Sequence, residues 1–170
     1  MKTLLRFFEM LSLSIWVGGI VFLSFILAPN AFRMLPPHEA GSLVGVTLTR
    51  LHMLGYFAAL LFLGVRVIGA LLAAPSDSFS RASLLVRPAV LAVLLMFLVT
   101  IVAQQGVRPR IDAARAEMIA TSGTVERAPK DSPLRADFDR LHRISVQLEG
   151  SVLLLGVAAM FLIAREPAQM

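Results

Sequence analysis

The chain has 170 residues, of which 57% are hydrophobic and only 16% charged, and its mean hydropathy is +0.78. This composition argues against a soluble single domain and favours a membrane protein. The absence of cysteine excludes disulfides, thiolate zinc sites, iron–sulfur clusters and thiol nucleophiles.

The first apolar run predicts a membrane span. Met10 to Phe32 is a stretch of 23 residues without a charge. At about 1.5 Å per residue it exceeds the roughly 30 Å of a bilayer's hydrocarbon layer. Lys2 and Arg6 precede it, as in a signal peptide, but its length and Pro29 in the region where cleavage would occur favour a retained anchor.

Three further apolar runs follow. The second has an uncharged core from Met53 to Val65, and the third covers Pro88 to Val107. The fourth starts near Phe138 and continues to Ala164. Because a span must satisfy its own backbone hydrogen bonds in lipid, the runs predict helices. We therefore expect an all-α, polytopic membrane protein, a single four-helix transmembrane domain over residues 1–170 with spans at about 7–33, 44–73, 85–107 and 139–164.

The third link, from Arg108 to Asp137, is the longest. Within it Ile111, Ala114 and Met118 recur at helical spacing among charged residues, which predicts a short amphipathic helix lying along the membrane surface. Thr121 to Pro133 reads as a polar loop, and Pro75 to Ser78 as a short turn in the second link.

The orientation in the membrane stays open. An even number of spans places both termini on one side, with five Lys and Arg residues, and the first and third links on the other, with ten. The positive-inside rule then favours cytoplasmic links, whereas Lys2 and Arg6 before the first span favour the reverse.

Polar residues within or beside the spans are the candidate site, because ionisable groups in lipid are costly and usually face the bundle interior. Near the long link, all four spans carry such residues, and Ser145 and Glu149 extend the set inward along one face of the fourth helix. Glu9 or Glu149 is expected to neutralise Arg66. The candidate ligand-binding residues are Glu9, Asn30, Arg33, Arg66, Gln104, Gln105, Ser145 and Glu149.

His52 and His142 are candidate ligands for a haem or a metal ion. Both lie near the starts of spans that begin on the same side, and two histidines on facing helices can hold one iron axially. The alternative is that both sit at headgroup level, hydrogen-bonded or solvated. Candidate helix-packing residues are Trp16, Gly18, Gly19 and Phe22, within one chain or between copies.

Two motifs carry a family resemblance. The first begins with Trp16-Val17-Gly18-Gly19 and continues to Phe32-Arg33. The second lies between Phe138 and Ser145 and contains Leu141-His142 followed by Ser145. The chain resembles the bacterial branch of the transmembrane protein 205-like family, small four-helix proteins with a domain of unknown function. The first-helix pattern is similar, more distantly, to copper-resistance D proteins and HemJ-type protoporphyrinogen oxidases. That distant similarity implies metal or haem chemistry, although Glu9 lies where the HemJ-type pattern has a histidine.

These features predict an integral membrane protein of the bacterial inner membrane whose polar cluster binds a small ligand, ion or partner. The alternatives are a haem- or metal-binding protein using His52 and His142, and a structural subunit of a membrane complex. No catalytic motif predicts an enzyme, although a bound cofactor could supply chemistry. Expected partners are membrane lipids and a second copy or another membrane protein, but no nucleic acid.

Overall fold

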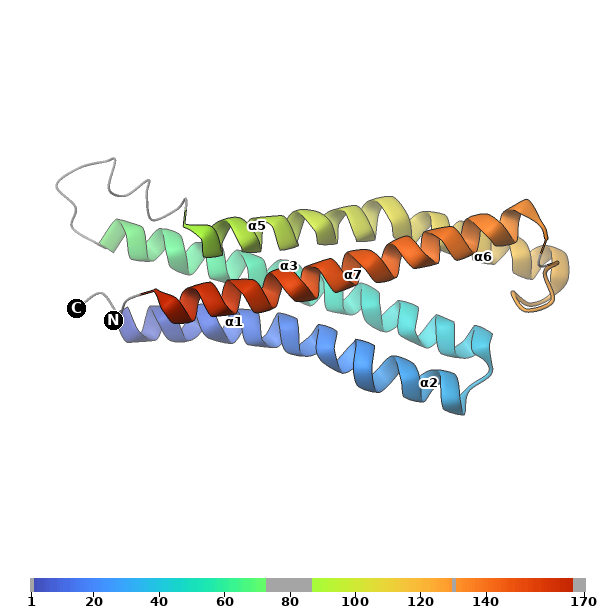
Figure 1. Cartoon of the computed structure of the whole chain (residues 1–170), viewed down its shortest axis with the longest axis horizontal. Coiled ribbons are helices and arrows are strands. Elements are labelled where there is room, and N and C mark those ends of the chain that lie inside the picture. The colour runs from blue at the N-terminus through green and yellow to red at the C-terminus, as the bar shows by residue number, and fades with distance from the viewer. Residues whose placement is uncertain (1, 73–86, 130, 167–170) are drawn as a thin grey trace.

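The computed structural model describes residues 2–72, 87–129 and 131–166, and these form four long helical rods. The first rod comprises α1 (Lys2–Phe22), the π-helical segment η1 (Leu23–Leu27) and α2 (Ala28–Met34), and the second is α3 (Pro37–Leu72). The third comprises α5 (Pro88–Ile101), η2 (Val102–Val107) and α6 (Arg108–Ser122), and the fourth is α7 (Pro133–Arg165). The rods lie alongside one another, with the start of α1 and the end of α7 at the same end (Figure 1).

Each rod is long and apolar enough to cross a membrane. The core between them contains Trp16, Phe62 and Met96, which are almost completely buried. The outer surface is equally apolar: Phe57 and Leu154 are 70% and 73% exposed. A surface of this kind fits lipid rather than water, since soluble proteins rarely expose large contiguous apolar patches. The chain is therefore a multi-pass, all-α integral membrane protein.

The helices are longer than the spans expected from the sequence. They contain 32 to 36 residues, or about 48–54 Å at 1.5 Å per residue, so they continue past the hydrocarbon layer or tilt within it. The expected span ends at residues 73 and 85, and the turn at 75–78, lie outside the described residues.

Two prolines explain the π-helical segments. Pro29 and Pro109 each stand two residues after such a segment ends. A proline has no N–H and its ring clashes with the carbonyl of the residue four positions earlier, which is Phe25 or Gln105 here. Widening the preceding turn relieves that clash within a continuous helix, and π-bulges often occur at functional sites.

The helix expected in the third link is present as α6, and Ile111, Ala114 and Met118 are buried as their spacing predicts. Its placement differs from the expectation. It continues α5 through η2 instead of lying separately along the membrane surface, and it runs beside α7 (Figure 1). The three residues pack against Phe138 of α7 and against Val125 and Ala128 of the connection, so this packing outweighs burial in a lipid surface.

The connection after α6 has a defined start and finish. Gly123, with φ +79°, ends α6 in a backbone conformation that favours glycine. Ser132 caps the start of α7 by accepting a hydrogen bond from the Arg135 backbone N–H at 3.2 Å, and Pro133 occupies the first helical position. The described residues of the polar stretch 121–133 therefore form a folded connection that packs against α6.

Candidate functional site

His52 lies at the centre of the first polar site, the histidine cluster, which consists of His52, Gln104 and Glu149. Its side chain is buried, with 3% of the residue exposed. The ring Nδ1 lies 2.7 Å from Gln104 Oε1, and Nε2 contacts Glu149 Oε1. Three helical rods therefore contribute one side chain each, from α3, η2 and α7.

The cluster lies deep in the bundle. Glu149 is sixteen residues from either end of α7, from Pro133 and from Arg165, which is about 24 Å along the helix in each direction. Gln104 belongs to η2, and the π-helical turn there changes which face of the helix carries it. Pro109 thus contributes to the position of a site residue five positions away.

The contacts define the proton content of the cluster. With Gln104 Oε1 facing Nδ1 and a carboxylate facing Nε2, both ring nitrogens face acceptors. A neutral imidazole has only one N–H, so satisfying both contacts requires one further proton, held either by the ring as an imidazolium or by the Glu149 carboxyl, which then donates to Nε2. The His52–Glu149 pair is then neutral overall. Loss of one proton would leave a negative charge inside the bundle, which is unfavourable in a low-dielectric interior without a cation.

The structure does not bring His142 to this cluster. His142 is exposed, stacks on Phe138 with ring centroids 6.4 Å apart, and lies seven residues before Glu149 on α7, about 10 Å along the helix. Both nitrogens of His52 are already in contact with Gln104 and Glu149. In the part of the chain that the structure describes, no group of three or more His, Cys, Asp or Glu residues is arranged to hold a metal ion.

The other residues expected near the long link also lie apart from the cluster. Arg33 and Gln105 are exposed, and Ser145 is half-buried one turn before Glu149. Asn30 lines an apolar groove of about 340 Å³ between the end of the first rod and the start of α3. The sequence predicts a cluster with side chains from all four helices, whereas the observed cluster has side chains from three rods.

The different surroundings of the two histidines give a prediction. His142→Ala is expected to change the free energy of unfolding by at most about 0.5 kcal/mol, as at an ordinary surface position. His52→Ala removes a buried partner of Gln104 and Glu149 and is expected to cost roughly 1–3 kcal/mol or more. Unfolding of both variants in detergent, followed by circular dichroism, tests this. Equal losses would contradict the assignment of His52 alone to the bundle interior.

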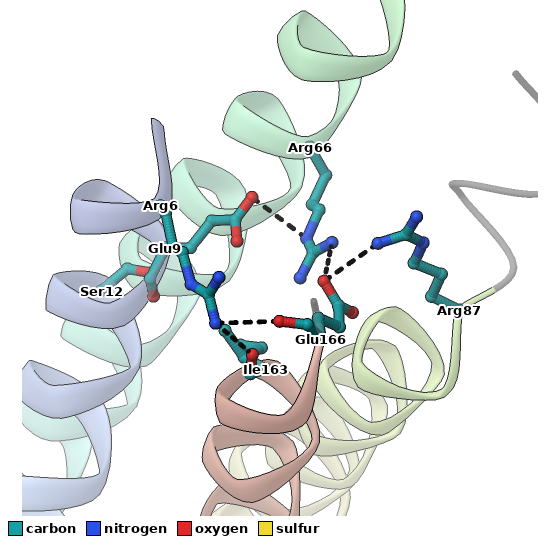
Figure 2. Close-up of polar contacts among 7 residues, drawn as sticks. All are labelled: Arg6, Glu9, Ser12, Arg66, Arg87, Ile163 and Glu166. Atoms are coloured by element: carbon teal, nitrogen blue, oxygen red, sulfur yellow. Dashed lines mark hydrogen bonds and ion pairs between the residues drawn. The ribbon is translucent and has the colours of Figure 1, made fainter. Parts of the chain in front are cut away.

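A second polar site lies at the end of the bundle that carries the start of α1 and the end of α7. We call it the arginine cluster, and its side chains come from α1, from α3 and from the cap residues at the start of α5 and the end of α7 (Figure 2). Its members are Arg6, Glu9, Arg66, Arg87 and Glu166.

Arg66 is the centre of the arginine cluster. Its Nη1 donates to Glu166 Oε2 at 2.9 Å, and its Nε lies 3.1 Å from Glu9 Oε1. Arg87 Nη1 reaches the same Glu166 oxygen at 3.1 Å. Of the two pairings expected for Arg66, the structure therefore contains the one with Glu9, whereas Glu149 pairs with His52.

Arg6 binds the end of α7. Its Nη2 donates to the backbone carbonyls of Ile163 at 2.9 Å and Glu166 at 3.2 Å (Figure 2). The last carbonyls of a helix lack partners within the helix and carry its negative dipole end, so a guanidinium is a favourable cap there. This contact fastens the end of the fourth rod to the start of the first.

Sequence reasoning missed Arg6, Arg87 and Glu166 as site residues. Each stands at or beyond an end of an apolar run, where a charge is usually explained by contact with headgroups. A signal was nevertheless available. All three ends fall on the same side of the membrane as Glu9 and Arg66, so acidic and basic residues at one level could have been paired.

The packing residues divide between the inside and the outside of the bundle. Trp16 is 1% exposed and lies against Gly55 of α3, and Gly19 lies against Leu51. Gly18 has open space where a Cβ would be, and Phe22 is 51% exposed. Trp16 and Gly19 therefore pack helices together in the described part of this chain, whereas Gly18 and Phe22 face outward.

Comparison with known proteins gives one match. A family model described as Domain of unknown function (DUF4149) matches residues 11–120, which is 110 of the 170 residues and includes His52, Arg66 and Gln104. No curated protein and no solved structure matches the chain.

Proposed function

We propose that this chain, which belongs to the DUF4149 family, binds a proton or a small cation within the membrane at the histidine cluster. The observation that carries the proposal is the buried His52 ring held between Gln104 and Glu149. Ionisable residues inside membrane spans commonly mark ion or proton pathways.

The charge balance of the His52–Glu149 pair supports exchange of its shared proton for a cation, in addition to a structural role as an ion pair. With its proton the pair is neutral, and without it the cluster carries one negative charge. A small cation bound at the Glu149 carboxylate would restore neutrality, because carboxylate oxygens are ligands for hard cations. Proton and cation are thus alternative occupants, and binding of one favours release of the other.

Arg108 lies on the side of the histidine cluster that faces the long link. Its guanidinium lies against Gly45, where an added Cβ would come within 2.4 Å of Nη2. Gly45 precedes His52 by seven residues, so it lies on nearly the same face of α3 about 10 Å nearer the long link. The guanidinium also pairs with Asp112, Nε to Oδ2 at 3.0 Å, so an ion pair and not an uncompensated positive charge lies on that side of the cluster.

The test is proton release on cation addition. The purified protein in lipid nanodiscs, in weakly buffered solution with a pH-sensitive dye, receives NaCl, KCl or MgCl₂. We expect one of these salts to release protons from the wild type and from His142→Gln but not from Glu149→Gln. Infrared difference spectra should show the matching change at the Glu149 carboxyl. If no salt releases protons, or if Glu149→Gln releases as many as the wild type, the proposed exchange is wrong.

We also propose that the protein resides in a bacterial inner membrane. The resemblance of Trp16-Val17-Gly18-Gly19 and of the Leu141-His142 motif to bacterial transmembrane protein 205-like sequences supports this proposal. Fractionation of native cells with an antibody to the chain tests it, and recovery in the soluble or outer-membrane fraction would overturn it.

A further inference from the structure

The arginine cluster has an excess of positive charge. Arg6, Arg66 and Arg87 contribute three positive charges, and Glu9 and Glu166 contribute two negative ones. Among the described residues the cluster is therefore left with one uncompensated positive charge. A partly buried excess charge is unfavourable in a membrane protein unless a counter-ion is bound.

The cluster also has hydrogen-bond donors without acceptors. The Arg66 side chain is only 9% exposed. Its Nη2 is buried without a hydrogen-bond partner in the described part of the chain, and its Nε contacts Glu9 without hydrogen-bond geometry. In Figure 2 the unpartnered nitrogen points into the space between Glu9, Arg6 and Glu166. Missing acceptors and an excess positive charge both call for an anionic oxygen.

The position of the cluster suggests where that oxygen comes from. Arg87 and Arg108 stand at the two ends of the uncharged third span, 21 residues apart, which is about 32 Å and close to the hydrocarbon thickness. The cluster thus lies at the headgroup level of one leaflet. Arg6 and Arg87 form its partly exposed rim, with 24% of the Arg87 side chain exposed.

We propose that the arginine cluster is a binding site for one phosphate group. Arg6 and Arg87 contact it at the rim, and Arg66 supplies the buried charge and a donor behind them. Guanidinium groups match phosphate oxygens because their planar N–H pairs can donate two parallel hydrogen bonds. Glu9 and Glu166 hold Arg66 and Arg87 in place and limit the charge that the site accepts.

The charge balance favours a phospholipid headgroup as the source. A phosphodiester carries one negative charge, which matches the excess of one. Free inorganic phosphate is a mixture of singly and doubly charged forms near neutral pH because its second proton titrates in that range, whereas the charge of a phosphodiester stays at one. A second negative charge beside Glu9 and Glu166 would be repelled.

The test counts bound lipid by native mass spectrometry of the delipidated protein in detergent. The probes are phosphatidylglycerol, phosphatidylethanolamine and diacylglycerol, which lacks the phosphate. We expect the wild type to retain one phospholipid but no diacylglycerol. Arg87→Gln should weaken retention about tenfold, the loss that corresponds to one charge-assisted hydrogen bond. Arg140→Gln, which removes an exposed charge at the opposite end of the bundle, is the matched control and should bind like the wild type.

Arg6→Gln is the second variant, used if circular dichroism shows that Arg87→Gln does not fold. Millimolar inorganic phosphate, added without lipid, distinguishes the two sources: binding that requires Arg87 and excludes phospholipid would assign the site to free phosphate. Equal retention of phospholipid and diacylglycerol, or equal retention by the Arg6 or Arg87 variant and the Arg140 variant, would overturn the proposal. Neither result depends on proton release at the histidine cluster.

Discussion

Arg66→Met is expected to lower the free energy of unfolding by roughly 3–5 kcal/mol, the loss seen when one partner of a buried ion pair is removed. Arg66 is the shared partner of Glu9 and Glu166, which come from different rods. Without it, the Glu9 carboxylate loses its ion-pair partner while the residue stays only 9% exposed. Contacts between the first, second and fourth rods would weaken together.

The double variant Glu9→Gln/Arg66→Met isolates the pair. Removing both charges relieves the unpaired carboxylate, so its loss should be smaller than the sum of the two single losses. Arg33→Met, which removes an exposed arginine from α2, should change stability by no more than about 0.5 kcal/mol. Unfolding in detergent by a graded denaturant measures all four. Strictly additive losses would show that Glu9 and Arg66 are not coupled.

Gly55→Ala is expected to destabilise the bundle by roughly 1–3 kcal/mol or more, through overpacking. An added Cβ would lie 2.5 Å from Trp16 Nε1 and 2.6 Å from Trp16 Cε2. The indole is rigid and almost fully buried, so it cannot move aside without shifting α1 from α3. The contact between the first two rods should therefore loosen.

Gly64→Ala is the matched control on the same helix. A Cβ there meets nothing within 4 Å, and alanine is favoured over glycine within a helix by about 0.5–1 kcal/mol. We expect a neutral or stabilising effect when both glycine variants are unfolded by heat in detergent and followed by circular dichroism. If Gly55→Ala matches Gly64→Ala, then Trp16 does not pack against α3 at that point.

Local patterns predicted the features that belong to a single helix. The buried face of α6 followed from the spacing of Ile111, Ala114 and Met118, because a helix repeats every 3.6 residues wherever it lies. Glu9 was a possible partner of Arg66 because residue counts along two antiparallel spans give comparable depths. Depth alone left Glu149 as an equal alternative.

The sequence by itself determined that the chain crosses the membrane as four helices, because uncharged runs of this length can satisfy their backbone groups in lipid only as helices. Tertiary structure alone decided that His52 meets Gln104 and Glu149 rather than His142, and that five charges from four helix ends converge. The physical reason is rotational. Periodicity fixes which side chains share a face, but how each helix turns toward its neighbours depends on packing such as Trp16 on Gly55 and on the turns widened ahead of Pro29 and Pro109.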